Sequence, residues 1–202
     1  MVAALTRASA IDLNAAARSG PLAGELPSRR RERAWVREAQ AGSHEAMEVL
    51  FRAHWGRAHR AAFLIVRDAA AAEDIAQEAF LAAIRALHRF DRRRPFGPWL
   101  HRIVVNRAID WSRARNLRRE VAEPSEQAAP PQHSEAWSDE VVGALGVLDP
   151  DQRAAVVLRH LLEYTPGEIA QLLEIPRGTV NSRLRRALDQ LAEELGPTEA
   201  RA

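Results

Sequence analysis

The chain has no cysteine, and all of its 29 basic residues are arginine, so lysine is absent as well. Without cysteine, disulfide frameworks, thiolate zinc sites and cysteine nucleophiles are excluded, and a reducing cytoplasm is the simplest location. Aromatic residues make up only 5% of the 202 residues, whereas 39 residues are alanine. This composition favours helices that pack through small side chains, so we expect an all-α protein.

Long hydrophobic runs are also missing. The longest uncharged and mostly apolar stretch, Val141–Leu148, has eight residues, far fewer than the roughly 20 that span a bilayer. We therefore expect no membrane insertion. Arg7, Asp12 and Arg18 interrupt the N-terminal apolar residues, which argues against a secretory signal, although the Ala/Arg/Ser-rich start leaves an organellar transit peptide open.

Patterns typical of enzymes are absent too. The sequence contains no H-E-x-x-H, no Walker-type glycine loop and no G-x-S-x-G. The seven histidines are scattered, and His54 and His59 are five residues apart, which does not place them on one helix face. We expect neither catalysis, nor a metal, nor a cofactor.

Charge is unevenly distributed along the chain. The net charge is only +2, and the pI of about 10.2 follows from the lack of groups that titrate between pH 8 and 12. Within Arg85–Arg119, however, eleven arginines stand against two acids, whereas residues 121–150 contain six acids and no arginine. A basic domain is thus followed by an acidic segment.

Proline divides the chain at the same places, because Pro124, Pro130 and Pro131 crowd the acidic segment between long proline-free spans. We expect two small helical domains joined by a flexible acidic linker. The expected parts are a disordered extension (1–32), a first helical domain (33–119), the linker (120–138), a second helical domain (139–196) and a tail (197–202).

Several helix starts can be predicted from capping residues. Ser43 and Asp68 precede helical apolar patterns, and Thr165-Pro166-Gly167-Glu168 has the form of a capping box with proline at the first position. In the helix after Asp68, we expect the side chains of Phe80, Ile84 and Leu87 to pack inward.

The C-terminal part of the chain, from Thr165 onward, predicts a helix-turn-helix. A capped helix, Thr165–Leu173, is followed by a break at Glu174–Pro176 and a second helix, Arg177–Arg186, with four arginines and no acid. Polar side chains near the start of such a helix can reach base edges, and arginines near its end can meet phosphates. From spacing alone, an ordinary helical hairpin with a solvated arginine face remains open.

The motif Gly178–Ala187 (GTVNSRLRRA), which includes most of this second helix, resembles region four of bacterial RNA polymerase sigma factors, specifically the extracytoplasmic-function (ECF) group. Leu148–Arg153 (LDPDQR) and Glu168–Ala170 (EIA) agree with that resemblance. In the basic domain, Ala72–Phe80 (AEDIAQEAF) and Phe96–Trp111 (FGPWLHRIVVNRAIDW) resemble region two. The order of the two regions, with an acidic linker between them, is similar to the ECF layout.

The resemblance implies a sigma factor that binds core RNA polymerase, through its largest and second-largest subunits, and directs initiation at particular promoters. It implies recognition of both duplex and single-stranded promoter DNA. The residues implied for core polymerase binding are Asp74, Gln77 and Glu78. Those implied for the minus-ten element are Asp91, Arg92, Arg93, Arg94, Arg102, Asn106 and Arg113. Those implied for the minus-thirty-five element are Arg177, Thr179, Asn181, Ser182, Arg183, Arg185 and Arg186.

Two departures from the family pattern bear on function. Glu174 stands where the family usually has glycine in the turn, and Asn181 replaces the usual lysine, which exchanges a phosphate-seeking charge for a group able to read a base. Two alternatives remain at this stage, a polymerase-independent helix-turn-helix regulator and a structural helical adaptor. An anti-sigma partner and a DNA contact of Trp111 are also left open, whereas Trp99 is assigned to the core.

Overall fold

The computed structural model describes residues 27–121 and 139–195, and every regular element in these two ranges is helical. The N-terminal bundle consists of α2 (Arg29–Gln40), α3 (His44–Val66), α4 (Ala69–Ala86), the turn η1 (Leu87–Arg89) and α5 (Phe96–Val121). The C-terminal bundle consists of α6 (Asp139–Ala144), η2 (Leu145–Val147), α7 (Pro150–Val156), η3 (Val157–Leu161), α8 (Pro166–Leu173) and α9 (Arg177–Leu195). The expected all-α class is confirmed.

The predicted caps are present. Ser43 Oγ and Asp68 Oδ1 each accept a hydrogen bond from the backbone N–H three residues further on, at 3.2 and 3.0 Å. Thr165 and Glu168 form the full capping box, in which Glu168 Oε2 accepts from the Thr165 N–H at 2.8 Å. These bonds satisfy backbone donors that the first turn of a helix leaves without partners, so the starts of α3, α4 and α8 are fixed locally.

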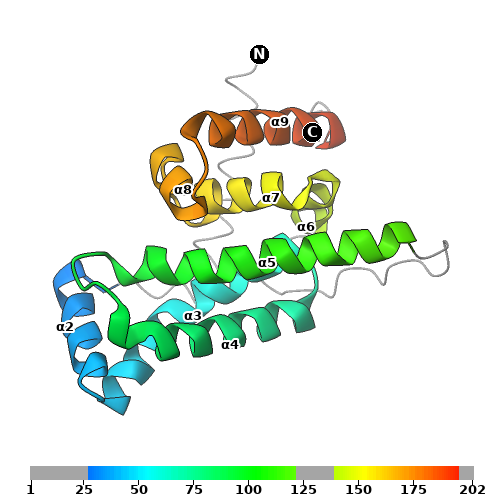
Figure 1. Cartoon of the computed structure of the whole chain (residues 1–202). Coiled ribbons are helices and arrows are strands. Elements are labelled where there is room, and N and C mark those ends of the chain that lie inside the picture. Colours follow the sequence, from blue (N-terminus) through cyan, green and yellow to red (C-terminus); the bar gives the residue numbers. More distant parts are fainter. Residues whose placement is uncertain (1–26, 122–138, 196–202) are drawn as a thin grey trace, which may run out of the picture.

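Alanine builds the core of the N-terminal bundle. Helices α3, α4 and α5 run side by side, with α2 across one end (Figure 1). Small side chains at the contacts let the helix backbones approach closely, as the alanine-rich composition suggests. The alanines with no exposed surface in this bundle are Ala58, Ala61, Ala62, Ala72, Ala76, Ala79 and Ala108.

Helix α2 corrects the expectation that residues 1–32 are disordered, because Arg29–Glu32 are its first turn. Ser28 Oγ caps the helix by accepting from Arg31 N–H at 3.4 Å, and Val36 and Ala39 bury its inner face. An arginine-rich segment therefore folds because a few apolar residues at helical spacing attach it to the bundle. Residues 1–26, 122–138 and 196–202, where the rest of the extension, most of the linker and the tail were expected, lie outside the described residues.

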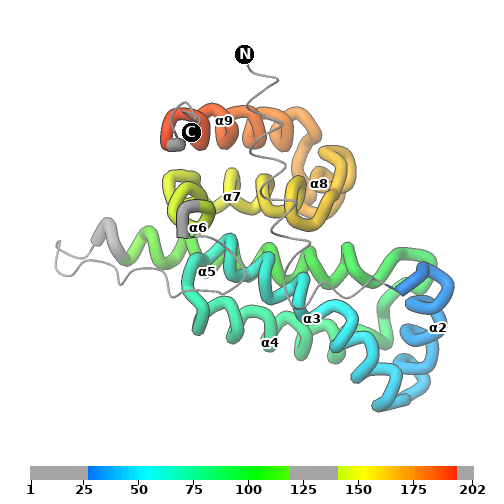
Figure 2. Tube along the Cα trace, turned by 180° about the vertical axis from the view of Figure 1, so that it is seen from behind, coloured from blue at the N-terminus to red at the C-terminus, as the bar shows by residue number. Residues whose placement is uncertain are grey.

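The two bundles pack against each other and share one continuous apolar core. Helix α7 lies on α3 and α5, and α8 lies on α5 near its first turns (Figure 2). We call this packing the closed arrangement. The sequence predicted two domains but did not predict this contact between them.

Arg153 on α7 is the buried polar link of this contact. Its guanidinium donates to three backbone carbonyl oxygens, those of Ile65 on α3 at 2.6 Å, Leu145 at 2.8 Å and Leu148 at 2.7 Å. Burial, together with the charge of Arg67, lowers the pKa of Arg153 to about 10, so the group remains charged at neutral pH. A charged side chain can be buried when hydrogen-bond acceptors surround its N–H groups, as the three carbonyls do here. Arg153 thereby ties the C-terminal bundle to the end of α3.

Candidate polymerase and nucleic-acid interface

The three residues predicted to bind core polymerase form an exposed patch on α4, which we call the clamp patch: Asp74, Gln77 and Glu78. Gln77 Nε2 donates to Glu73 Oε1 at 3.1 Å, which adds a further carboxylate to the same face. Glu78 Oε2 lies 3.8 Å from Arg107 Nε on α5. The opposite side of α4 is buried, so the helix presents an acidic face to solvent that the closed arrangement leaves uncovered.

The expectation that Ile84 packs inward is wrong. Phe80 and Leu87 are buried, but Ile84 is 46% exposed. Leu81, beside it, is 51% exposed. The inner stripe of α4 runs through Ala79, Phe80, Ala83 and Leu87, and Ile84 lies at its edge. These side chains give α4 an apolar margin next to the clamp patch.

The segment Asp91–Pro95, which we call the arginine loop, is a tight turn before α5. Asp91 Oδ1 accepts from Arg93 N–H at 2.9 Å, and Asp91 O accepts from Arg94 N–H at 3.0 Å. Arg92, Arg93 and Arg94 are all exposed. Asp91 thus has a role in shaping the backbone, which turns three arginine side chains toward solvent.

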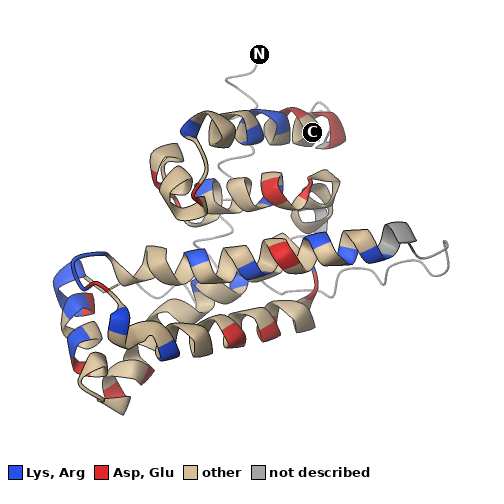
Figure 3. Cartoon of the chain, viewed as in Figure 1, with Lys and Arg blue, Asp and Glu red and all other residues tan. Residues whose placement is uncertain are grey.

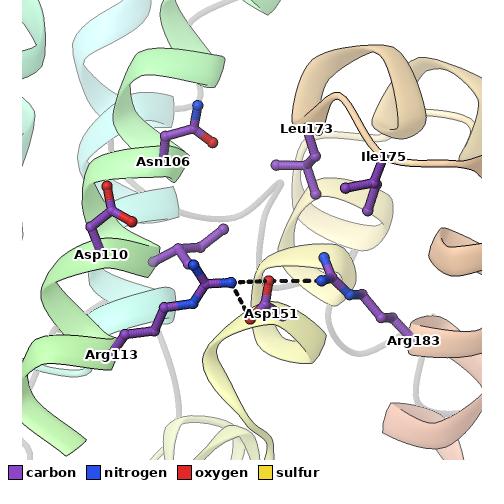
Figure 4. A pocket seen from close by; sticks show the side chains of 8 residues that line it. Asn106, Asp110, Arg113, Asp151, Leu173, Ile175 and Arg183 are labelled. Atoms are coloured by element: carbon purple, nitrogen blue, oxygen red, sulfur yellow. Dashed lines mark hydrogen bonds and ion pairs between the residues drawn. The ribbon is translucent and has the colours of Figure 1, made fainter. Parts of the chain in front are cut away.

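The other residues predicted for the minus-ten element lie on the face of α5 that meets the C-terminal bundle. Arg102 Nη2 pairs with Glu174 at 2.7 Å, and Arg113 Nη2 contacts both carboxylate oxygens of Asp151 at 2.9 and 2.8 Å. This hydrogen bond raises the pKa of Arg113. Asn106 lies between them on an exposed position of the helix, facing the turn after α8 (Figure 4).

The residues predicted for the minus-thirty-five element divide into two groups on α9. Arg177, Asn181, Arg185 and Arg186 are exposed, and Ser182 Oγ donates to the carbonyl of Thr179 at 2.9 Å. Arg183 is turned inward instead and pairs with Asp151 Oδ1 at 3.0 Å. The structure therefore places most of the set on the outside of α9, with Arg183 at the contact between bundles.

Asp151 joins the two sets. Figure 4 shows its carboxylate between Arg113 of α5 and Arg183 of α9, at one side of a cavity of about 310 Å³ that Asn106 and Asp110 also line. Residues predicted to read two different promoter elements thus face each other across one space. In the closed arrangement their cationic groups are neutralised by acids of the protein itself.

The turn of the helix-turn-helix accommodates glutamate at the position where the family usually has glycine. Glu174 adopts the left-handed conformation, with φ 55° and ψ 42°, which glycine reaches without strain and other residues adopt at a cost of about 1 kcal/mol. Its side chain meets Arg102 of the other bundle. The departure from the family pattern keeps the turn and adds a contact between bundles.

Sequence reasoning missed a buried polar pair at the same contact. His101 Nδ1 lies 2.7 Å from Tyr164 Oη, and burial lowers the pKa of His101 to about 3 while it raises the pKa of the Tyr164 hydroxyl. Both groups are neutral over the physiological range, so they form an uncharged hydrogen bond between α5 and the loop before α8. Nothing in the local spacing of either residue could have indicated the other.

The two tryptophans of α5 are both half-buried. Trp99 packs with Phe90 and Phe96, which agrees with its assignment to the core. Trp111 packs against the core on one side and has the guanidinium of Arg115 5.0 Å from its ring centroid on the other. Trp111 therefore has a packing role in the closed arrangement.

No group of three or more His, Cys, Asp or Glu side chains in residues 27–121 and 139–195 is arranged to hold a metal ion. No helix among them is long and apolar enough to cross a membrane.

Comparison with known families decides between the alternatives. Residues 50–118 match the family Sigma-70 region 2, and residues 138–191 match the family Sigma-70, region 4. The ECF RNA polymerase sigma factor SigM of Mycobacterium tuberculosis is 36% identical over 159 residues, covering 77% of this chain and 80% of SigM. The chain belongs to the ECF sigma factors. It is a protein that works with core RNA polymerase to direct initiation at particular promoters.

Other relatives agree with this family. RNA polymerase sigma factor CarQ of Myxococcus xanthus is 35% identical, with 78% of this chain and 94% of CarQ covered. The structure of CnrH in complex with the cytosolic domain of CnrY superposes with a TM-score of 0.63 at 27% identity, covering 82% of this ECF sigma factor and 97% of CnrH. A helix-turn-helix regulator that works without polymerase is not favoured, since region 2 is present as well as region 4. Sigma factors as a class are not enzymes.

Proposed function

We propose that the clamp patch of this ECF sigma factor docks on core polymerase before either DNA-binding set is used. The observation that supports this order is accessibility. Asp74, Gln77 and Glu78 are exposed in the closed arrangement, whereas Arg102, Arg113 and Arg183 are paired with acids across the contact between regions 2 and 4. A partner in solution can therefore reach the whole polymerase-binding face, whereas each DNA-binding set has members that are paired within the protein.

Opening then exchanges one set of anions for another. Asp151 and Glu174 satisfy three arginines in the closed arrangement, and DNA phosphates can replace both carboxylates once regions 2 and 4 separate. The ion pairs are partly exposed, so each contributes little to closure and binding energy from polymerase suffices to overcome them. DNA binding without polymerase is expected to be weak for the same reason.

In the open form, region 2 is proposed to capture a base of the minus-ten element. Asn106 offers both a donor and an acceptor to a base edge, and the neighbouring arginines of α5 and of the arginine loop can hold the strand. A flipped base costs a few kcal/mol of lost stacking, so the site acts once the strand is single. Region 4 is proposed to read the minus-thirty-five element through α9, with Asn181 at a base edge and Arg183 and Arg185 on phosphates.

The division into regions, the cellular location and a regulatory partner complete the proposed function. We propose that residues 33–119 carry the functions of region 2 and residues 139–196 those of region 4, and that the first turn of α2, before residue 33, supports region 2. The protein is proposed to act in the bacterial cytoplasm. CnrH was solved in complex with the cytosolic domain of CnrY, and we propose that an anti-sigma protein is a partner of this sigma factor as well.

The test is to reverse the charge of the clamp patch. Asp74→Arg with Glu78→Arg changes two exposed residues four positions apart, so it should leave the fold intact and weaken binding of labelled sigma factor to core polymerase at least tenfold. Asp189→Arg with Glu193→Arg is the matched control, because it reverses two exposed acids at the same spacing on α9. If both variants bind polymerase as the wild type does, the docking assignment is wrong.

A further inference from the structure

Helix α2 is attached along its length to the arginine loop. Gln40 Nε2 donates to the carbonyl oxygens of Leu87 and Phe90, both at 2.9 Å, where the chain enters the loop. Arg33 Nη2 donates to the carbonyl of Arg93, at 3.3 Å, in the middle of the loop. These bonds join residues 47 to 60 positions apart and fix the loop backbone relative to α2.

The exit of the loop is held from the same helix. Glu32 is buried, accepts from the Phe96 N–H at 3.2 Å, and lies 3.0 Å from His54 Nε2 on α3. Burial raises the pKa of Glu32, but hydrogen bonds from His54 and from the backbone of Phe96 and Gly97 outweigh it, so the pKa is lowered. The carboxylate is therefore ionised at neutral pH and anchors the inner face of α2 at the start of α5.

The outer face of α2 carries a row of cations, which we call the arginine stripe. Arg30, Arg33 and Arg37 are exposed and follow one another at helical spacing, whereas Glu32 points into the bundle and Glu38 lies to the side. Figure 3 shows the basic residues of α2 and those of the arginine loop gathered at one end of the molecule. One continuous basic surface thus extends from the loop along the helix.

We propose that the arginine stripe binds phosphates of promoter DNA beside the minus-ten element, and that α2 is part of the DNA-binding surface of region 2. This inference rests on the proposed function, since it extends the surface that the arginine loop begins. Arginine is suited to the role because its planar guanidinium binds phosphate through two parallel hydrogen bonds.

The dimensions agree with a strand of DNA. Arg30 and Arg37 are seven residues apart, which is about 10 Å along a helix, and a strand of duplex DNA advances about 3.4 Å per nucleotide. The stripe therefore spans about three phosphates. The hydrogen bonds of Gln40, Arg33 and Glu32 fix its distance from the loop, so a strand whose base is held near the loop passes the stripe in a defined register.

The experiment compares two double variants in complete holoenzyme with a duplex promoter. Arg30→Ala with Arg37→Ala removes two charges of the stripe and leaves Arg33, which supports the loop, in place. Arg52→Ala with Arg159→Ala is the control, because it removes two exposed arginines from other surfaces and changes the net charge equally. Alanine favours helix, so neither pair of substitutions should unfold the helical elements in which it lies.

The measured quantity is the salt dependence of promoter binding. Each lost phosphate contact lowers the slope of log K against log salt by about 0.7 for single strands to 0.9 for duplex DNA. We expect the slope of the Arg30/Arg37 variant to fall by about 1.4 to 1.8 and the slope of the control to stay at the wild-type value. A neutral methylphosphonate at a contacted phosphate should then weaken wild-type binding and leave the Arg30/Arg37 variant unchanged.

Three results would overturn the inference. The first is an unchanged slope in the Arg30/Arg37 variant. The second is an equal reduction of the slope in both variants, which would mean that the effect depends on net charge alone. The third is a loss of affinity for core polymerase in place of DNA, which would assign α2 to a protein contact. If wild-type protein fails to direct any promoter binding by core polymerase, the proposed function itself fails. That outcome is separate, because it needs no variant.

Discussion

Asp151 holds one arginine from each of α5 and α9, the two helices proposed to bind DNA, so replacing it with asparagine tests whether charge maintains the closed arrangement. Its carboxylate receives Arg113 of region 2 at 2.8 Å and Arg183 of region 4 at 3.0 Å. Asparagine has nearly the same shape but no charge, so it leaves two guanidinium groups facing each other across the contact without their shared anion. The expected result is a larger fraction of open molecules.

The size of the effect follows from exposure. A hydrogen bond to a charged group contributes about 1.5 to 3 kcal/mol when well shielded, and an exposed ion pair about 0.2 to 1 kcal/mol. The side chain of Arg113 is 54% exposed and that of Asp151 is 22% exposed, so the contribution across the contact lies near the lower range, at about 1 kcal/mol. The ratio of open to closed molecules should rise about fivefold.

The lack of native cysteine makes the measurement direct. Arg85→Cys on α4 and Gln190→Cys on α9 introduce the only two thiols, on helices that lie on opposite outer sides of the closed arrangement (Figure 1). Single-molecule energy transfer between dyes on these thiols reports separation of the two regions. Raising the salt concentration should open the wild type and affect Asp151→Asn less, because salt screens partly exposed pairs.

Asp189→Asn is the control for Asp151→Asn, since it neutralises an exposed carboxylate on α9 away from the contact. Two outcomes would refute the reasoning. One is an unchanged open fraction in Asp151→Asn, and the other is equal opening in both variants. A lower melting temperature without any change in distance would show instead that Asp151 stabilises region 4 alone.

Three further predictions use other residues of the same contact. Glu174→Gly removes about 1 kcal/mol of left-handed backbone strain and an ion pair worth about 0.5 kcal/mol. The free energy of unfolding should therefore rise slightly, while the fraction of open molecules also rises because the ion pair is lost. A lower melting temperature would contradict this. His101 has a pKa of about 3 in the folded protein, below its ordinary 6.5. The stability that its neutral side chain contributes is therefore fully present above pH 6.5 and is lost as the pH falls toward 3. Between pH 7.5 and 5, urea unfolding of the wild type should lose about 2 kcal/mol more than His101→Gln, which does not titrate, and equal losses would show that other groups dominate. Asn106→Ala should bind polymerase normally but reduce permanganate reactivity of unpaired thymines at duplex promoters, with a smaller defect on a premelted template; normal opening, or loss of helical circular dichroism, would count against the proposed role.

The helix starts were predictable because they depend on neighbours in sequence. Ser43, Asp68 and Thr165 each cap a backbone N–H three residues away, so residue type and spacing are sufficient. The residues proposed to bind DNA were also assigned from short motifs, which lie on α9 for the minus-thirty-five set and on α5 and the preceding arginine loop for the minus-ten set. The start of α2 was missed, because five arginines within nine residues, Arg29–Arg37, obscured the apolar positions that attach it to the bundle.

The sequence by itself determined several helix starts, the two regions and the family, since each depends on short segments of the chain. Only the tertiary structure decided that regions 2 and 4 close on each other and that α2 supports the arginine loop. Arg113 and Asp151 are 38 residues apart, and Gln40 and Phe90 are 50 apart, with at least one complete helix between them in each case. Such pairs form only where helix packing brings their faces together, and no local periodicity specifies which faces meet.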